Sequence, residues 1–404
     1  MSDARTHYED LLAKGATHSM MHAAIHAMTD TDLASYGLNA YRMNLISLFG
    51  TLWSPQRVEA TARSAVLSKL WLGWEYYQHY LPGQGVLPPP PHLQGGLVER
   101  VQSLLALGRG LLVASFHQGH MRHIASDLAN AGLHMHLPLA TDAWRDYHAA
   151  QAATPGAAMW QYFHYINVEV PGGALAIARA LGRKGLVYST LDGNTGMDGP
   201  RGTERRTQVT MHGRNVMVKD GLLTMAAKFG TPILPVIAHS EGDSRVCRFG
   251  TVLDPGGRLS GREATVFVAD AAQSLYGLLA DDLSEFAGEW CGGDLFHQWR
   301  VPEPHGEMDA GAAEIIVRQV LEGHARVAVN PRRATALGSS GDVMLLDALS
   351  MRGYKVPADA AEFFDEDMSQ AVRGDGIPQE VAARGAAWLR AMVGRDLLVL
   401  SARR

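Results

Sequence analysis

Residues 110–116 read GLLVASF, and this stretch decides the interpretation of the chain's fold. A continuous apolar run of this length is typical of a strand that is buried on both faces of a parallel sheet. Helical patterns flank it, LVERVQSLLALG at residues 97–108 and MRHIASDLANAG at residues 121–132. The sequence therefore predicts an α/β domain with a mostly parallel sheet flanked by helices.

The same alternation continues toward the C-terminus. Further short apolar runs predict strands at 134–140, 165–170, 186–191 and 231–238. Helical spacing of apolar residues predicts helices at 171–185 and 218–230. The alternation of predicted strands and helices supports one α/β domain across this part of the chain.

Proline-rich and glycine-rich stretches divide the chain. GVLPPPPHLQGG lies before the α/β pattern, and VPEPHGEMD follows it. DVMLLDALSMRGYKV then predicts two short strands of a small domain. We expect a helical N-terminal region (1–95) packed on an α/β domain (96–303), followed by a linker with a helix (304–325) and a small domain (326–404).

Composition excludes several classes of protein. The chain has 404 residues, a formal net charge of -5 and two cysteines. This argues against binding to duplex nucleic acid and against a disulfide framework. The N-terminus has no secretory pattern, so we expect a cytoplasmic protein. The apolar run at 41–53 is too short to span a membrane and allows at most peripheral membrane contact.

The stretch HQGHMRHIASD after the first strand is the densest group of chemically active side chains. His117 comes directly after the buried strand, where ligands of open α/β sheets bind, so it is a candidate general base. His120, His123 and Asp127 share one face of the following helix, and Asp127 is a candidate partner that orients a ring. Two alternatives stay open: a His/Asp metal site of a hydrolase or oxidase, and histidines with structural roles only.

A second polar group follows the strand at 186–191. Asp192 is a candidate carboxylate, and the backbone of Gly193 and Asn194 is a candidate substrate contact. Four arginines are candidates to bind a phosphate or a carboxylate: Arg201, Arg205, Arg206 and Arg214. The alternative is a solvated loop.

Four stretches resemble the bacterial lipid A biosynthesis (lauroyl/myristoyl) acyltransferases of the lysophospholipid acyltransferase superfamily. They are LLVASFHQGHMR, LGRKGLVYSTLDGNTG, MHGRNVMVKDGLLTMAAKFGTPILPVIA and FAGEWCGGDLFHQWR, and together they lie within residues 30–300.

The resemblance implies acyl transfer by a histidine and an acid spaced H-x4-D/E. His117 would be the base, but its +5 position is Arg122, which we count among the substrate-binding candidates. The acid would then come from Asp127 or Asp192. The donor would be a thioester of coenzyme A or of an acyl carrier protein, with no bound cofactor or metal, and the acceptor an amine or a hydroxyl. We expect no counterpart of the family's N-terminal membrane anchor.

The C-terminal region resembles the PqqD-like winged-helix domains, which implies recognition of a peptide by strand addition. The acceptor would then be a peptide or a natural-product intermediate. A structural cap is the alternative for this domain. For the whole chain, a non-catalytic peptide-binding protein on a degenerate acyltransferase fold remains a further alternative.

Overall fold

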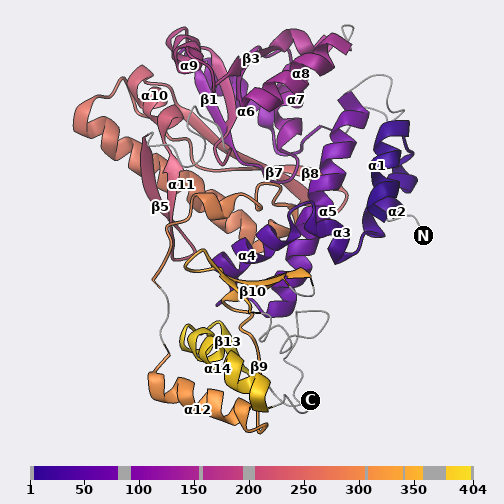
Figure 1. Cartoon of the computed structure of the whole chain (residues 1–404). Coiled ribbons are helices and arrows are strands. Elements are labelled where there is room, and N and C mark those ends of the chain that lie inside the picture. Colours follow the sequence, from indigo (N-terminus) through magenta and orange to yellow (C-terminus); the bar gives the residue numbers. More distant parts are fainter. Residues whose placement is uncertain are drawn as a thin grey trace. The chain divides into compact units, whose positions relative to one another are not determined.

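A computed structural model describes residues 4–80, 92–153, 158–193, 205–304, 308–339, 342–357 and 379–401. The chain forms two compact units (Figure 1). Unit 1 contains Met1–Tyr36 and Arg63–Arg300, and unit 2 contains Gly37–Ala62 and Val301–Arg404.

Unit 1 is built on a six-stranded sheet with the order β3-β2-β4-β1-β7-β8. Its strands are β1 (Leu111–Ser115), β2 (Met135–Leu139), β3 (Phe163–Asn167), β4 (Leu186–Thr190), β7 (Ile233–Glu241) and β8 (Ser244–Phe249). All neighbours pair in parallel except β7 and β8, which form an antiparallel pair at one edge. The predicted α/β fold with a mostly parallel sheet flanked by helices is confirmed.

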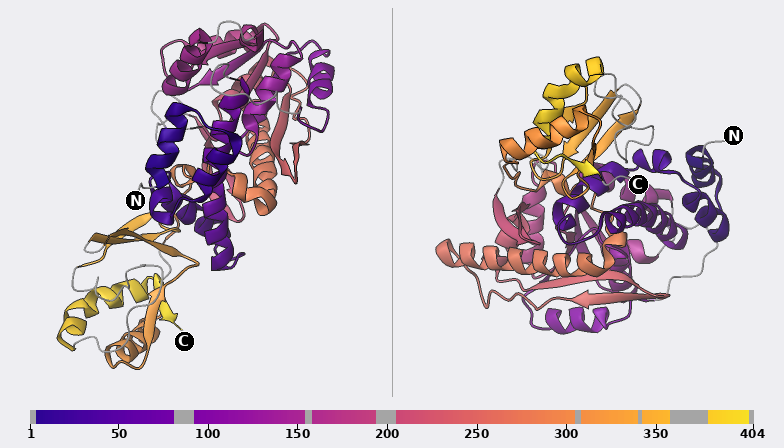
Figure 2. Two further views of the ribbon diagram at one scale, coloured as in Figure 1. Left: turned by 90° about the vertical axis from the view of Figure 1, so that its right-hand side faces the viewer. Right: turned by 90° about the horizontal axis from the view of Figure 1, so that it is seen from below.

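Helices cover the sheet on both faces (Figure 2). The described helices that lie wholly within unit 1, whether or not they contact the sheet, are α1 (Ala4–Lys14), α2 (His18–His26), α3 (Asp30–Ala34), α6 (Leu97–Leu105), α7 (Met121–Asn130), α8 (Thr141–Ala153), α9 (Gly173–Gly182), α10 (Gly221–Phe229) and α11 (Gly261–Phe286). The described residues of unit 1 also form the short 3-10 helices η1 (Ala158–Tyr162), η3 (Ala287–Glu289) and η4 (Phe296–Gln298). Strands β5 (Arg206–Met211) and β6 (Arg214–Lys219) form a separate hairpin.

Strand β1 lies at the centre of the core. Its five residues are all buried, as the apolar run predicts. Leu111 and Val113 belong to one core cluster with α6 and α7 residues, Val101 and Ile124 among them. Since successive side chains of a strand point to opposite faces, Leu112 and its alternate neighbours face the other helical layer. The end of β1 is therefore held from both sides.

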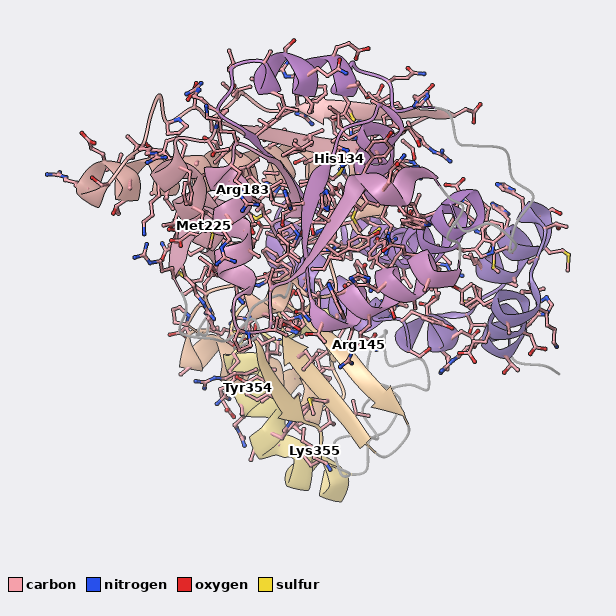
Figure 3. The ribbon with its side chains drawn as sticks, turned by 90° about the horizontal axis from the view of Figure 1, so that it is seen from above. His134, Arg145, Arg183, Met225, Tyr354 and Lys355 are labelled. Carbon is pink, nitrogen blue, oxygen red and sulfur yellow. The ribbon has the colours of Figure 1, made fainter. Side chains whose placement is uncertain are left out.

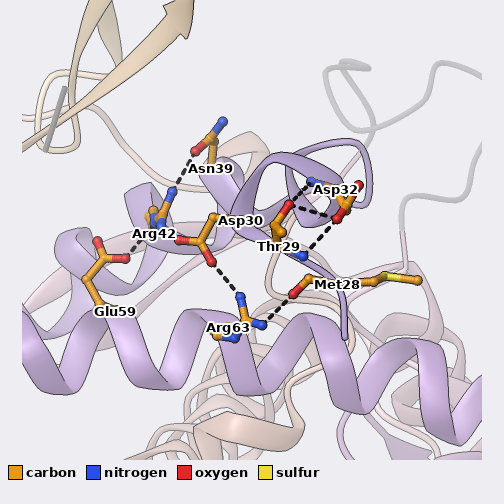
Figure 4. Close-up of polar contacts among 8 residues, drawn as sticks. All are labelled: Met28, Thr29, Asp30, Asp32, Asn39, Arg42, Glu59 and Arg63. Carbon is orange, nitrogen blue, oxygen red and sulfur yellow. Dashed lines mark hydrogen bonds and ion pairs between the residues drawn. The ribbon is translucent and has the colours of Figure 1, made fainter. Parts of the chain in front are cut away.

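Side chains fix the first helices of unit 1 (Figure 4). A capping box begins α3: Thr29 Oγ1 accepts from the Asp32 amide and Asp32 Oδ2 accepts from the Thr29 amide. Arg63 donates to Asp30 Oδ1 and to the Met28 carbonyl, both at 2.5 Å. Its segment of the long helix α5 (Pro55–Tyr80) is thus tied to the loop before α3.

Unit 2 combines α4 (Leu38–Phe49) with α12 (Ala310–Leu321) and α14 (Gln379–Gly394). Its strands are β9 (Arg326–Val329), β10 (Ala334–Ser339), β11 (Asp342–Asp347), β12 (Arg352–Lys355) and β13 (Leu398–Ser401). They form an antiparallel sheet β10-β11-β12 and an antiparallel pair β13-β9. Tyr354 and Lys355 mark β12 in Figure 3, and the Arg395 guanidinium lies 5.4 Å from the centre of the Tyr354 ring.

The structure groups residues 37–62 with unit 2, whereas the sequence prediction assigned all of 1–95 to a region on the α/β domain. The physical reason lies in the apolar run at 41–53: α4 buries Tyr41, Leu45 and Phe49 and lies against β10. At its end, a Cβ on Gly50 would approach the Arg332 carbonyl oxygen to 2.5 Å. In the part of the chain that is described, no helix is long and apolar enough to cross a membrane.

The strands predicted at 110–116, 134–140 and 186–191 match β1, β2 and β4 within one residue, whereas β7 ends three residues beyond the predicted 231–238. Two further elements differ from their predicted bounds. The strand expected at 165–170 is β3 at 163–167, because residues after Asn167 turn toward α9. The helix expected at 218–230 begins at Gly221, since Val218 pairs with Thr207 in the β5–β6 hairpin. The proline run at 88–91 lies outside the described residues.

Candidate functional site

His117 and Asp192 meet at one edge of the sheet. β1 and β4 are parallel neighbours, and Ser115 pairs in register with Thr190, so the residues after them emerge side by side. The His117 Nδ1 lies 2.9 Å from Asp192 Oδ1, and the His117 amide donates to both carboxylate oxygens at 2.9 and 3.0 Å. Asp192 is only 3% exposed. Of the two acids predicted as partners, Asp192 is the one in contact.

The contact fixes which ring nitrogen is basic. The carboxylate accepts, so Nδ1 carries the proton and Nε2 has the free lone pair. Nε2 lies 3.4 Å from Thr190 Oγ1. The His117 side chain is 31% exposed. The pair has the geometry of a base oriented by a buried acid.

The turn after β1 is anchored on three sides. Gln118 is fully buried and donates through Nε2 to Asp282 Oδ2 and to the Phe286 carbonyl, both at 2.9 Å. Gly119 has a φ of +49° and its amide donates to the Glu289 carbonyl oxygen. A Cβ there would collide with the Ala238 carbonyl oxygen, so only glycine fits. The backbone that carries His117 is therefore held rigidly.

The segment at residues 291–292 packs against the His117–Asp192 pair. The Gly292 amide donates to the His117 carbonyl at 2.9 Å. A Cβ on Gly292 would lie 2.7 Å from Asp192 Oδ2. Burial raises the pKa of the neighbouring Cys291 thiol to about 12, so this thiol is uncharged. In the sequence, FAGEWCGGDLFHQWR is singled out only for its resemblance. Its two adjacent glycines are the signal that could have predicted a close approach of this backbone to the His117–Asp192 pair.

Asp127 and Arg122 take other roles. Asp127 Oδ2 accepts from the Leu93 amide at 2.7 Å, and its Oδ1 lies 3.3 Å from His92 Nδ1. Asp127 therefore holds the segment before α6 and does not orient His117. The Arg122 guanidinium lies 5.7 Å from the centre of the Tyr76 ring.

The residues predicted to bind a substrate phosphate or carboxylate do not all lie together. Gly193 follows Asp192 directly, and Arg205 is exposed, while Asn194 and Arg201 lie outside the described residues. Arg206 pairs with Lys219 at the open end of the β5–β6 hairpin, and Arg214 pairs with Met211 at its turn. Arg206 and Arg214 thus lie at opposite ends of the hairpin and do not form one site.

A second cluster contains Glu75, His120 and His123. All three are buried, and one potential ligand atom from each lies within 4.8 Å of the others. Burial, and then the charges of Arg245 and His239, lower the pKa of His120 to about 3, so its ring is neutral. The sequence grouped His120 and His123 with His117 and Asp127; the structure brings in Glu75 instead.

A cavity of about 470 Å³ lies beside this second cluster. Its lining includes Glu75, His120, Glu289, Trp71 and His18, and does not include His117. The His117–Asp192 pair and the cavity are therefore separate features of unit 1. No model of a known protein family matches the chain, and no curated protein is significantly similar to it in sequence.

Proposed function

We propose that the protein is an acyltransferase that moves an acyl group from a thioester donor to an amine or hydroxyl acceptor. The observation that carries the proposal is the 2.9 Å contact between His117 Nδ1 and the buried Asp192, at the carboxyl edge of a parallel sheet. The resemblance of four stretches to thioester-dependent acyltransferases supports the choice of reaction. Asp192 supplies the acid that position 122, an arginine, does not.

In the proposed reaction, His117 Nε2 takes the proton from the acceptor as its nitrogen or oxygen attacks the thioester carbonyl carbon. Asp192 stabilises the imidazolium that forms. The tetrahedral intermediate collapses, the C–S bond breaks, and the thiolate receives the proton from Nε2. The backbone at Gly193 is the candidate donor to the developing oxyanion. The proton taken from the acceptor thus ends on the leaving thiol, and the reaction needs no cofactor.

The donor is expected to be a thioester of coenzyme A or of an acyl carrier protein. Arg205, directly before the β5–β6 hairpin, and Arg206, the first residue of β5, are the described candidates for contacts with the donor's phosphates. Arg122 is the candidate nearest to the base in sequence. The acceptor is proposed to be a peptide or natural-product intermediate, because the C-terminal region resembles peptide-recognition domains and β10 and β12 are the outer strands of its antiparallel sheet.

The test follows thiol release from a panel of acyl-coenzyme A and acyl carrier protein thioesters, with amine, hydroxyl and peptide acceptors. His117→Ala should lower turnover by about 100-fold or more, the usual contribution of a general base. The matched control is His324→Ala, a change to an exposed histidine of unit 2. Undiminished turnover in His117→Ala would refute the assignment, and tight peptide binding without any turnover would favour the non-catalytic alternative.

A further inference from the structure

Three buried side chains with metal-binding atoms converge in unit 1 and serve no purpose in the proposed acyl transfer. Glu75 comes from α5, His120 from the turn after β1 and His123 from the first turns of α7. Their exposures are 8%, 6% and 3%. One ligand atom from each lies within 4.8 Å of the other two. Two imidazoles and a carboxylate are a common ligand set for zinc.

His120 provides an independent sign of a missing ligand. Its Nε2 lies 2.9 Å from Ser240 Oγ, whereas its Nδ1 is buried without a hydrogen-bond partner among the described residues. Buried ring nitrogens are normally paired. If Nε2 donates to the hydroxyl, Nδ1 has its lone pair free to bind a metal, which is the usual arrangement of a metal-bound histidine with an outer partner.

Glu75 is also held from outside the cluster. Its Oε1 forms an ion pair with Arg245 Nη2 at 2.9 Å, and both side chains are about nine-tenths buried. The second oxygen of the carboxylate is then available to a metal, while Arg245 fixes the orientation of the group. Asp243 and Glu289 line the adjoining cavity together with Arg245. Their carboxylates compensate the positive charge of the Arg245 guanidinium, which would otherwise repel a bound cation.

We propose that Glu75, His120 and His123 form a site for a divalent transition-metal ion such as Zn²⁺, separate from the His117–Asp192 pair. In a tetrahedral site with ligands at about 2.0–2.1 Å, the ligand atoms lie about 3.3–3.5 Å apart, so the three side chains must draw together by small rotations. The fourth position faces the cavity of about 470 Å³, which leaves it open to water or another small ligand. The ion would connect α5 to the turn that follows β1.

The test measures metal and needs no acyl-transfer assay. The full chain, purified after growth with added zinc, is analysed for metals by mass spectrometry; about one equivalent per chain is expected. Metal-free protein is then titrated with Zn²⁺ against a chromogenic chelator and with Co²⁺ by its visible absorption. His120→Ala, His123→Ala and Glu75→Gln should each weaken binding by 100-fold or more. Ser240→Ala, a positioning change, should weaken it by about 10- to 100-fold.

His164→Ala is the control, since it removes a ring from β3 that lies outside the cluster. Circular dichroism checks the fold of every variant, and Glu75→Gln and Ser240→Ala keep the test decisive if the histidine variants unfold. Absence of stoichiometric metal together with only millimolar Zn²⁺ affinity, or unchanged affinity in the folded variants, overturns the proposal. His117→Ala should retain the metal, which separates this result from that of the acyltransferase assay.

Discussion

Asp192 contacts His117 across 75 positions of sequence, with its Oδ1 2.9 Å from Nδ1 and both of its oxygens accepting from the His117 amide. The residue five positions after His117 is Arg122, whose guanidinium lies 5.7 Å from the centre of the Tyr76 ring. Asp192 lies two residues after β4, the parallel neighbour of β1, and its carboxylate contacts the His117 ring from there. The buried carboxylate fixes both the tautomer of the ring and the backbone that carries it.

Changing Asp192 to Asn should abolish most of this arrangement. An amide can donate to Nδ1 and so favour the tautomer in which Nε2 carries the proton, which is the wrong one for a base. We expect turnover to fall by about 10³-fold with a smaller change in KM. Steady-state thiol release measures both constants. Turnover within threefold of the unmodified protein would contradict the role given to Asp192.

Asp127→Asn is the matched change at the other acid that the sequence suggested. Asp127 accepts from the buried Leu93 amide at 2.7 Å and does not contact His117. The variant should lose about 1–2 kcal/mol of unfolding free energy, because the charged acceptor becomes a weaker one. Its kcat/KM should stay within about twofold. Urea denaturation and the thioester assay test the two halves, and a 100-fold loss of activity in a folded variant would contradict the assignment.

Gly292→Ala should damage the pair without removing either member. The added Cβ would lie 2.7 Å from Asp192 Oδ2 and 3.0 Å from His117 Cβ, so the carboxylate must move. We expect turnover to fall by about 10- to 100-fold and stability to fall by about 1–3 kcal/mol. The control is Gly277→Ala in α11, where a Cβ meets nothing within 4 Å and helix propensity favours alanine. Equal turnover in the two variants would show that the contact does not matter.

The sequence predicts the centre of unit 1 well because its signals are local. A buried run at 110–116 and another at 186–191 predict two strands, and the residue after each lies at the carboxyl edge. These two signals predict His117 and Asp192 as candidate site residues. Their pairing also requires that β4 lie beside β1, and no local pattern encodes that strand order.

Other features depend on contacts between distant segments. Glu75 is an ordinary acidic residue in a long helix, and only the fold brings it to His120 and His123. The sequence predicted His120, His123 and Asp127 on one helix face, but α7 begins at Met121, so His120 lies in the turn before it. The Asp127 carboxylate accepts from the Leu93 amide. The apolar run at 41–53 indicates burial but not the unit against which it is buried.

Unit 2 contains a buried ion pair that should determine its stability. Asp347 is fully buried, and its Oδ2 accepts from Arg333 Nη2 at 3.1 Å and from Ser350 Oγ at 2.7 Å. Asp347→Ala leaves the Arg333 charge buried without this partner, so we expect a loss of about 3–5 kcal/mol. Amide exchange of β10 and β11 in increasing urea measures it in the full chain. The control is Glu314→Ala, whose exposed pair with Arg390 should contribute less than about 1 kcal/mol.

The contribution of Asp347 should also depend on pH. Burial alone raises the pKa of Asp347, but the hydrogen bonds from Ser350, the Leu349 amide and Arg333 together outweigh it and hold the pKa below its ordinary value of 3.8. A lowered pKa in the folded state stabilises the fold above pH 3.8, and this stabilisation is lost as the pH falls through the folded value. The difference between the unmodified protein and Asp347→Ala should therefore be constant from pH 5 to 7 and shrink below about pH 4. Each protein is first brought to its unfolding equilibrium in urea at the chosen pH. A brief pulse of amide exchange at one fixed pH then labels the unfolded fraction, and the two fractions give the difference in unfolding free energy. If the difference instead grows as the medium becomes more acidic, the carboxylate form of Asp347 is not the one that stabilises unit 2.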